Sequence, residues 1–132
     1  MRNAAGPGSP YDPSAECGAI ADKVAPPAGE AVVVKHYPNS FVGTELEAHL
    51  KAAGVKNLVV VGFMTHMCIN STARGAFNLG YAVTVPAAAT ATRALPAPDG
   101  SVVEAAALQL AALTALADLF AVVVTDGAAI PD

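Results

Sequence analysis

Four short apolar runs, rich in valine, recur along the chain. They are Ala31–Lys35, Leu58–Phe63, Tyr81–Val85 and Phe120–Thr125. Each run is too short for an ordinary globular helix and too uniformly apolar for a half-exposed strand, which is typical of parallel strands covered on both faces. The pattern therefore predicts four strands of a buried parallel sheet.

The segments between these runs carry helical signals. Thr44–Glu47 has the capping-box sequence, in which the threonine oxygen and the glutamate carboxylate satisfy each other's backbone donors, and Gly54 ends this helix. Ser101–Glu104 repeats the box before a long helix that reaches about Leu119. A further helix is predicted from about Cys68 to Leu79. Strands that alternate with helices imply right-handed crossovers and one three-layer α/β/α domain with a parallel, Rossmann-like sheet.

The first 29 residues break this alternation. They contain five of the ten prolines and are expected to be irregular, with one short helical turn near Ala15–Lys23. No internal repeat or interdomain linker follows, so residues 1–132 are predicted to form a single domain.

The composition argues against a membrane-spanning protein and against a nucleic-acid-binding protein. Apolar residues make up 54% of the chain and the mean hydropathy is +0.47, but no uninterrupted apolar run approaches the roughly 18 residues of a membrane helix. A net charge of −4 without a lysine or arginine cluster argues against nucleic-acid binding. The helix after Ser101 is apolar nearly all round, so it either packs deeply over the sheet or forms a homo-oligomer interface.

Two cysteines, Cys17 and Cys68, are too few for a disulfide scaffold. The opening MRNAAGPGSP lacks the apolar core of a secretory signal. The simplest interpretation is a reducing, cytoplasmic setting, which a reactive thiol requires.

Two candidates for chemistry lie at the carboxyl ends of predicted strands, where ligands of parallel sheets collect. Lys35 closes one strand, and Gly62–Cys68 leaves the next strand and enters a helix. The amino-terminal end of a helix and a nearby ammonium both favour a thiolate, and the helix N–H groups can hold an oxyanion. A lone cysteine is more often a small buried hydrophobe, and a strand-terminal lysine is usually solvated. Their shared edge favours the functional interpretation.

Two segments carry a specific resemblance to a known family. GFMTHMCINSTARGAFNLGYAV is similar to the nucleophile motif of the isochorismatase-like cysteine hydrolases, and KHYPNSFVGTELEAHLKAAGVKNLVVVG resembles the segment that carries their catalytic lysine. The similarity runs from about Gly29 to Val124. The family includes nicotinamidases, N-carbamoyl amidases, other small-amide hydrolases and isochorismatase itself.

The resemblance implies a role for each matching residue. Cys68 would attack a carbonyl carbon of a small-molecule substrate to form a thioester, and Lys35 would stabilise the thiolate and the charged intermediate. The backbone N–H groups of Met64 and Cys68 match the oxyanion hole, which in the family depends on a cis peptide bond, here Phe63–Met64. Phe41 matches a position that lines the substrate pocket.

The sequence gives less support to a functional role for the histidines and to a bound metal or cofactor. His66 lies near the pocket mouth and is a candidate for substrate binding, although a hydrogen bond at the start of the helix is the more common role. His36 and His49 show no ligand spacing, and His49 is expected on the exposed side of its helix. The metal-binding segment of nicotinamidases has no counterpart here. Neither a metal nor a cofactor is expected.

The family's triad also contains an aspartate at the end of its first strand. No valine-rich strand followed by Asp-x-Gln precedes Lys35, and Asp12, Asp22 and Asp126 do not match the position. The family's first strand is central, so we expect a gap between the strand ending at Lys35 and the other three. We interpret the chain as truncated at its amino terminus, through a fragment or a misplaced start. The alternative is a shortened homologue whose gap another chain fills.

The function therefore has more than one interpretation. The leading one is a hydrolase of amides or related C–N bonds, with catalysis by this chain alone left open. The second is an inactive homologue that binds a partner or oligomerises through its apolar helix. A vinyl-ether hydrolase of the isochorismatase type is a third, less favoured because that chemistry does not need the cysteine.

Overall fold

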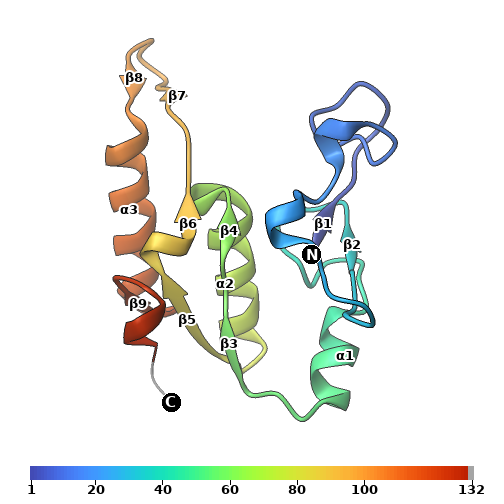
Figure 1. The fold of residues 1–132 in the computed structure, drawn as a ribbon. Helices are drawn as coiled ribbons and strands as arrows, with labels where there is room; N and C mark the ends of the chain where they lie inside the picture. Colours follow the sequence, from blue (N-terminus) through green and yellow to red (C-terminus); the bar gives the residue numbers. More distant parts are fainter. Residues whose placement is uncertain (131–132) are drawn as a thin grey trace.

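Figure 1 shows the fold of this protein, a computed structural model that describes residues 1–130. Its helices are α1 (Leu46–Ala52), α2 (Asn70–Asn78) and α3 (Ala105–Ala117). Its strands are β1 (Arg2–Asn3), β2 (Val34–Lys35), β3 (Asn57–Val59), β4 (Gly62–Phe63), β5 (Ala82–Pro86), β6 (Thr90–Ala91), β7 (Leu95–Pro96), β8 (Val102–Val103) and β9 (Val122–Val124). Strands and helices alternate through the central part of the chain, as the sequence predicts.

The main sheet has the order β3-β5-β9, and both pairings are parallel. Leu58 pairs with Val83, and Val85 pairs with Val123. Because side chains alternate across a strand, these four share one face of the sheet. Val83 and Val85 belong to the buried core cluster with Ile69, Ala73, Ala76, Leu113 and Leu116 of the helical layer, and Leu58 and Val123 pack against it. The core therefore lies between this sheet and the helices α2 and α3.

The opposite sheet face keeps large apolar side chains in contact with solvent. Val59 and Val122 are 51% and 54% exposed, and the register through Thr84 places them on the same face. Val61 and Phe63 continue this exposure along the β3–β4 segment.

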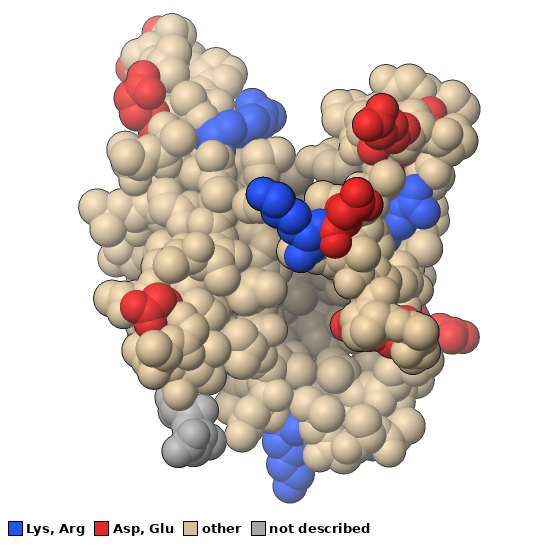
Figure 2. All heavy atoms as spheres, viewed as in Figure 1, with Lys and Arg blue, Asp and Glu red and all other residues tan. Residues whose placement is uncertain are grey.

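A separate two-stranded sheet holds β2. It pairs in parallel with β1, with Arg2 opposite Val34 and Asn3 opposite Lys35. Within residues 1–130, β2 has no pairing with β3, which agrees with the expected gap between the Lys35 strand and the other three. Figure 2 shows the surface hollowed between these two parts. β1 itself was not predicted, because Arg2–Asn3 lies in the Pro/Gly-rich opening and has no apolar pattern.

Several predicted boundaries are wrong in detail. The run Ala31–Lys35 is strand only at Val34–Lys35, and Leu58–Phe63 is divided into β3 and β4. The first 29 residues contain two 3₁₀ turns, Glu16–Gly18 and Asp22–Val24, where one turn was expected. None of the described helices is long and apolar enough to cross a membrane.

Both predicted capping boxes are also wrong. The Thr44 hydroxyl accepts from the Leu46 N–H and donates to the Ser40 carbonyl, while Glu47 pairs with Lys51 at 2.5 Å. The Ser101 hydroxyl donates to Asp99 in a turn. The chain reverses there into β8 before α3 begins, so Ser101 lies too far from the helix to cap it.

Candidate active site

The structure brings Lys35 and Cys68 together, as their strand-end positions predict. Lys35 Nζ lies 3.4 Å from Cys68 Sγ. The two side chains are buried, at 5% and 6% exposure. Lys35 is the last residue of β2, and Cys68 follows β4 in the turn that leads into α2. A buried ammonium is costly unless it is paired, so a thiolate at this distance would be its natural counter-ion.

Three oxygen acceptors hold the Lys35 ammonium. Nζ donates to Asn3 Oδ1 at 2.5 Å, to the Tyr37 carbonyl at 2.9 Å and to the Pro38 carbonyl at 3.3 Å. None of these groups is charged, and the described ion pairs involve other residues. The positive charge is therefore uncompensated within residues 1–130 unless Cys68 ionises.

Asn3 is a site residue that the sequence did not reveal. Its amide Nδ2 lies 3.6 Å from Cys68 Sγ, while its Oδ1 accepts from Lys35. Sulfur thus faces two N–H donors, an arrangement that suits an anion better than a neutral thiol. Asn3 lies 65 positions from Cys68 in an unpatterned segment. Only the parallel pairing of β1 with β2 puts it beside Lys35.

The turn that carries Cys68 begins earlier than predicted. Thr65–Ile69 is a π-helical turn with Met64 as its N-cap, and α2 follows directly. Cys68 is therefore within the first turn of the helical run and not its first residue. Single π turns occur preferentially at functional sites. The Phe63–Met64 peptide bond is cis, as the family resemblance implied.

A cavity of about 150 Å³ opens beside the sulfur. Its lining includes Asn3, Tyr11, His36, Tyr37, Met67 and Cys68. Phe41 does not line it and instead stacks on Tyr81, with 5.9 Å between ring centroids. His66 also lies outside the lining, with its Nδ1 in a short hydrogen bond with Thr92.

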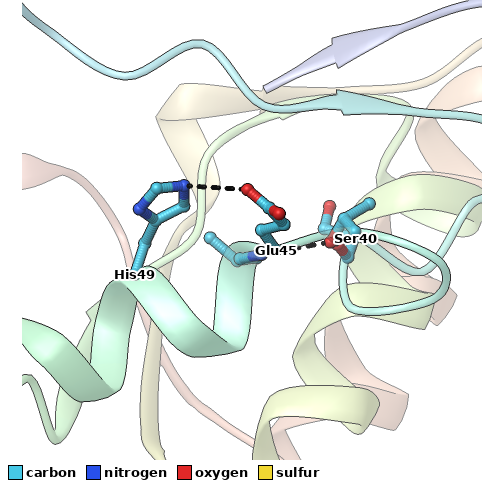
Figure 3. Close-up of polar contacts among 5 residues, drawn as sticks. Ser40, Glu45 and His49 are labelled. Carbon is cyan, nitrogen blue, oxygen red and sulfur yellow. Dashed lines mark hydrogen bonds and ion pairs between the residues drawn. The ribbon is translucent and has the colours of Figure 1, made fainter.

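No described carboxylate reaches Cys68. Asp12 is buried in its own loop, where it accepts hydrogen bonds from Gly8 and Ser14, and Asp126 caps the 3₁₀ turn Gly127–Ala129. Residues 1–130 also contain no group of three or more His, Cys, Asp or Glu side chains that could hold a metal ion. His49 is exposed on α1, and its Nε2 lies 4.0 Å from Glu45 Oε2. Figure 3 shows the ring facing this carboxylate.

Comparison with known proteins decides the family. The isochorismatase domain model matches residues 2–127. The chain belongs to the isochorismatase family. The family protein YddQ of Bacillus subtilis is 42% identical over 115 residues, which cover 87% of this chain and 63% of YddQ. The secreted isochorismatase effector Isc1 of Verticillium dahliae is 41% identical, over 80% of this chain and 53% of Isc1.

Solved structures of isochorismatase-family proteins superpose closely. An isochorismatase from Pseudomonas putida matches with a TM-score of 0.92 and 35% identity, covering 98% of this chain and 66% of that one. The match confirms the predicted fold class, a three-layer α/β/α fold with a parallel sheet. The chain thus spans less than two thirds of the length of these relatives.

Some relatives have names that state an activity. The ureidoacrylate amidohydrolase RutB of Stutzerimonas stutzeri is 39% identical over 72 residues, which cover 54% of this chain and 29% of RutB.

Proposed function

We propose that this chain carries the nucleophile of a cysteine hydrolase that cleaves a small-molecule amide or related C–N bond through a thioester. One observation carries the proposal: a buried lysine ammonium lies 3.4 Å from the sulfur of a buried cysteine that lines a small cavity. An ammonium at this distance favours the thiolate, which is the nucleophilic form. The name of RutB, an amidohydrolase, supports the amide as the substrate class.

The reaction balances with these two side chains. The Cys68 thiolate attacks the carbonyl carbon, and the backbone N–H groups of Met64 and Cys68 are assigned to the resulting oxyanion. The C–N bond then breaks, and the leaving nitrogen takes a proton from the Lys35 ammonium. Water attacks the thioester, Lys35 accepts its proton, and the carboxylic acid leaves as the thiolate is regenerated. The sum is hydrolysis of the amide, with no cofactor or metal.

The remaining assignments concern the residues that contact the substrate and the cellular location of the protein. Neither His66 nor Phe41 lines the cavity in this structure. His66 could contact a substrate there if its hydrogen bond with Thr92 broke, and Phe41 if its ring moved away from Tyr81. A cytoplasmic location would keep the two free thiols reduced. The fungal relative is named as a secreted effector, so fractionation of cells that express the chain is the appropriate test.

Two features favour a second function, that of an inactive binding domain. No described carboxylate stands beside Cys68 to take its proton, and large apolar side chains on the sheet face that carries Val59 and Val122 are exposed. Both features suit an inactive domain that binds a partner or a second copy.

Hydrolysis assays separate the two functions. The purified chain is incubated with a panel of small primary amides and N-carbamoyl compounds, and ammonia release is measured. We expect turnover that Cys68→Ala abolishes and that Cys17→Ala, which changes an exposed cysteine, leaves intact. Absence of cysteine-dependent turnover across the panel would favour the binding domain.

A further inference from the structure

The loop after β2 is hydrogen-bonded to two elements at once. On one side, its Tyr37 and Pro38 carbonyls accept from Lys35 Nζ. On the other side, Thr72 Oγ1 of α2 lies 3.3 Å from the same Pro38 carbonyl oxygen. The Pro38 carbonyl therefore stands between the lysine ammonium and the helix.

A second contact fixes the loop to the same threonine. The Ser40 backbone N–H donates to Thr72 Oγ1 at 3.1 Å, and Thr72 Oγ1 lies 3.0 Å from Ser40 Oγ. Both residues are buried, at 5% and 8% exposure, so water does not readily replace these hydrogen bonds. The Ser40 carbonyl accepts from Thr44 just ahead of α1, the region drawn in Figure 3.

Thr72 shares a helix face with the candidate nucleophile. It follows Cys68 by four positions in the continuous helical run of Thr65–Ile69 and α2, and residues at this spacing are neighbours on one face. One turn further along, Gly75 leaves room for the loop. A Cβ atom at Gly75 would lie 2.6 Å from Asn39 Nδ2.

We propose that Thr72, with Ser40 as its partner, is a positioning residue that holds the Lys35 ammonium against the Cys68 sulfur. It acts through the Pro38 carbonyl, and it does not line the cavity beside Cys68. The inference rests on the proposed function, because position matters only if Lys35 stabilises a thiolate.

The geometry explains why the carbonyls need an anchor. An ammonium has three N–H donors, yet Nζ has four polar neighbours, of which the Pro38 carbonyl and the sulfur are the most distant, at 3.3 and 3.4 Å. A shift of the loop would let Lys35 follow its carbonyl acceptors away from sulfur. Fixing Pro38 to the helix that carries Cys68 prevents that separation.

The test uses two alkylating reagents of different charge on a Cys17→Ser background, so that Cys68 is the only thiol. The ratio of the iodoacetate rate to the iodoacetamide rate reports positive charge beside the sulfur, and a general loss of packing does not raise or lower it selectively. The ratio and its dependence on pH are measured for Thr72→Val, Thr72→Ser and Ser40→Ala. Thr90→Val is the matched control, because Thr90 has the same 8% exposure and bonds to Ala87 and Gln109.

We expect Thr72→Val to lower the ratio about fivefold, the effect of one hydrogen bond. Thr72→Ser and Thr90→Val should keep the ratio of the parent. If Thr72→Val does not fold, by circular dichroism, Ser40→Ala takes its place. If the ratio is high in the Cys17→Ser chain and neither Thr72→Val nor Ser40→Ala changes it, the positioning role is overturned, while the proposed function stands. A parent ratio no higher than that of the urea-unfolded chain overturns the proposed function itself.

Discussion

At the scale of single residues, Cys68 is defined by what surrounds its sulfur. The Lys35 ammonium and the Asn3 amide both present N–H donors to it. Burial removes the water that would otherwise solvate a negative sulfur, so these donors take its place. These contacts support the proposal that Cys68 is the nucleophile.

Asp12 gives a prediction about pH. Hydrogen bonds from the Ser14 hydroxyl and from the N–H groups of Ser14 and Gly8 lower the pKa of Asp12 below its ordinary value of 3.8. A lowered pKa means that ionised Asp12 stabilises the fold above 3.8, and that this contribution is lost as the pH falls through the folded-state value. Asp12→Asn should therefore reduce the free energy of unfolding at neutral pH, with the deficit shrinking at acidic pH.

Urea unfolding at about pH 7 and about pH 3 measures this deficit. Asp22→Asn, which changes an exposed carboxylate, is the control and should show little effect at either pH. A deficit for Asp12→Asn that is as large at pH 3 as at pH 7 would contradict the assignment.

The sequence indicates part of this site and hides the rest for a physical reason. Lys35 and Cys68 follow apolar strand patterns, so the rule that parallel strands end at one edge places them together. Asn3 lies in a segment without periodicity, and only its pairing with β2 positions it. Thr72 lies on a recognisable helix, but its contact with Pro38 depends on the path of a loop that no pattern encodes.

At the scale of elements, the type of each core element was predictable and its length was not. The valine-rich runs became strands, yet β2 and β4 are only two residues long. The apolar composition of a run indicates that it is buried, but the length of a strand also depends on a neighbouring strand that accepts and donates its hydrogen bonds. Within the described residues, β2 has such a neighbour on one side only. The Thr44–Glu47 capping box did not form because neighbours four positions away hold both side chains: Thr44 donates to the Ser40 carbonyl, and Glu47 pairs with Lys51.

The helix α3 gives a prediction that compares two leucines. Leu116 is fully buried between α3 and the sheet, whereas Leu110 is 69% exposed. Leu116→Ala should lower the free energy of unfolding by about 2–5 kcal/mol through the lost burial and the remaining cavity. Leu110→Ala should change it by no more than about 0.5 kcal/mol. Urea unfolding gives both values, and equal effects would show that α3 is not packed as described.

At the scale of the whole molecule, the β1–β2 sheet has no strand pairing with the β3-β5-β9 sheet within the described residues, and the two parts meet through side chains and loops. The contact of Lys35 with Cys68 links the β1–β2 sheet to the helical run that follows β4, and the contact of Thr72 with the Pro38 carbonyl joins the same two parts. The proposed catalytic pair thus lies at the junction of two parts, so its geometry should respond to anything that moves one part against the other.

Exposed apolar surface leads to a prediction about assembly. Leu110 and Leu119 are each more than half exposed on α3 and the segment after it. We propose that this surface forms a homo-oligomer interface, because apolar surface of this kind is stabilised by burial. Light scattering after size-exclusion chromatography should give a mass above 13.2 kDa, and Leu110→Glu should lower it. A monomer at high concentration would contradict the proposal.

The most direct test of the buried nucleophile is competition between the two cysteines of the same chain. Cys17 is exposed and Cys68 is buried, so accessibility alone favours Cys17. With limiting iodoacetamide at neutral pH, peptide mass spectrometry should show Cys68 alkylated faster. Lys35→Met should slow Cys68 by about tenfold, whereas Lys56→Met, at an exposed lysine, should not. Faster alkylation of Cys17 in the unaltered chain, or a Cys68 rate that Lys35→Met leaves unchanged, would contradict the account.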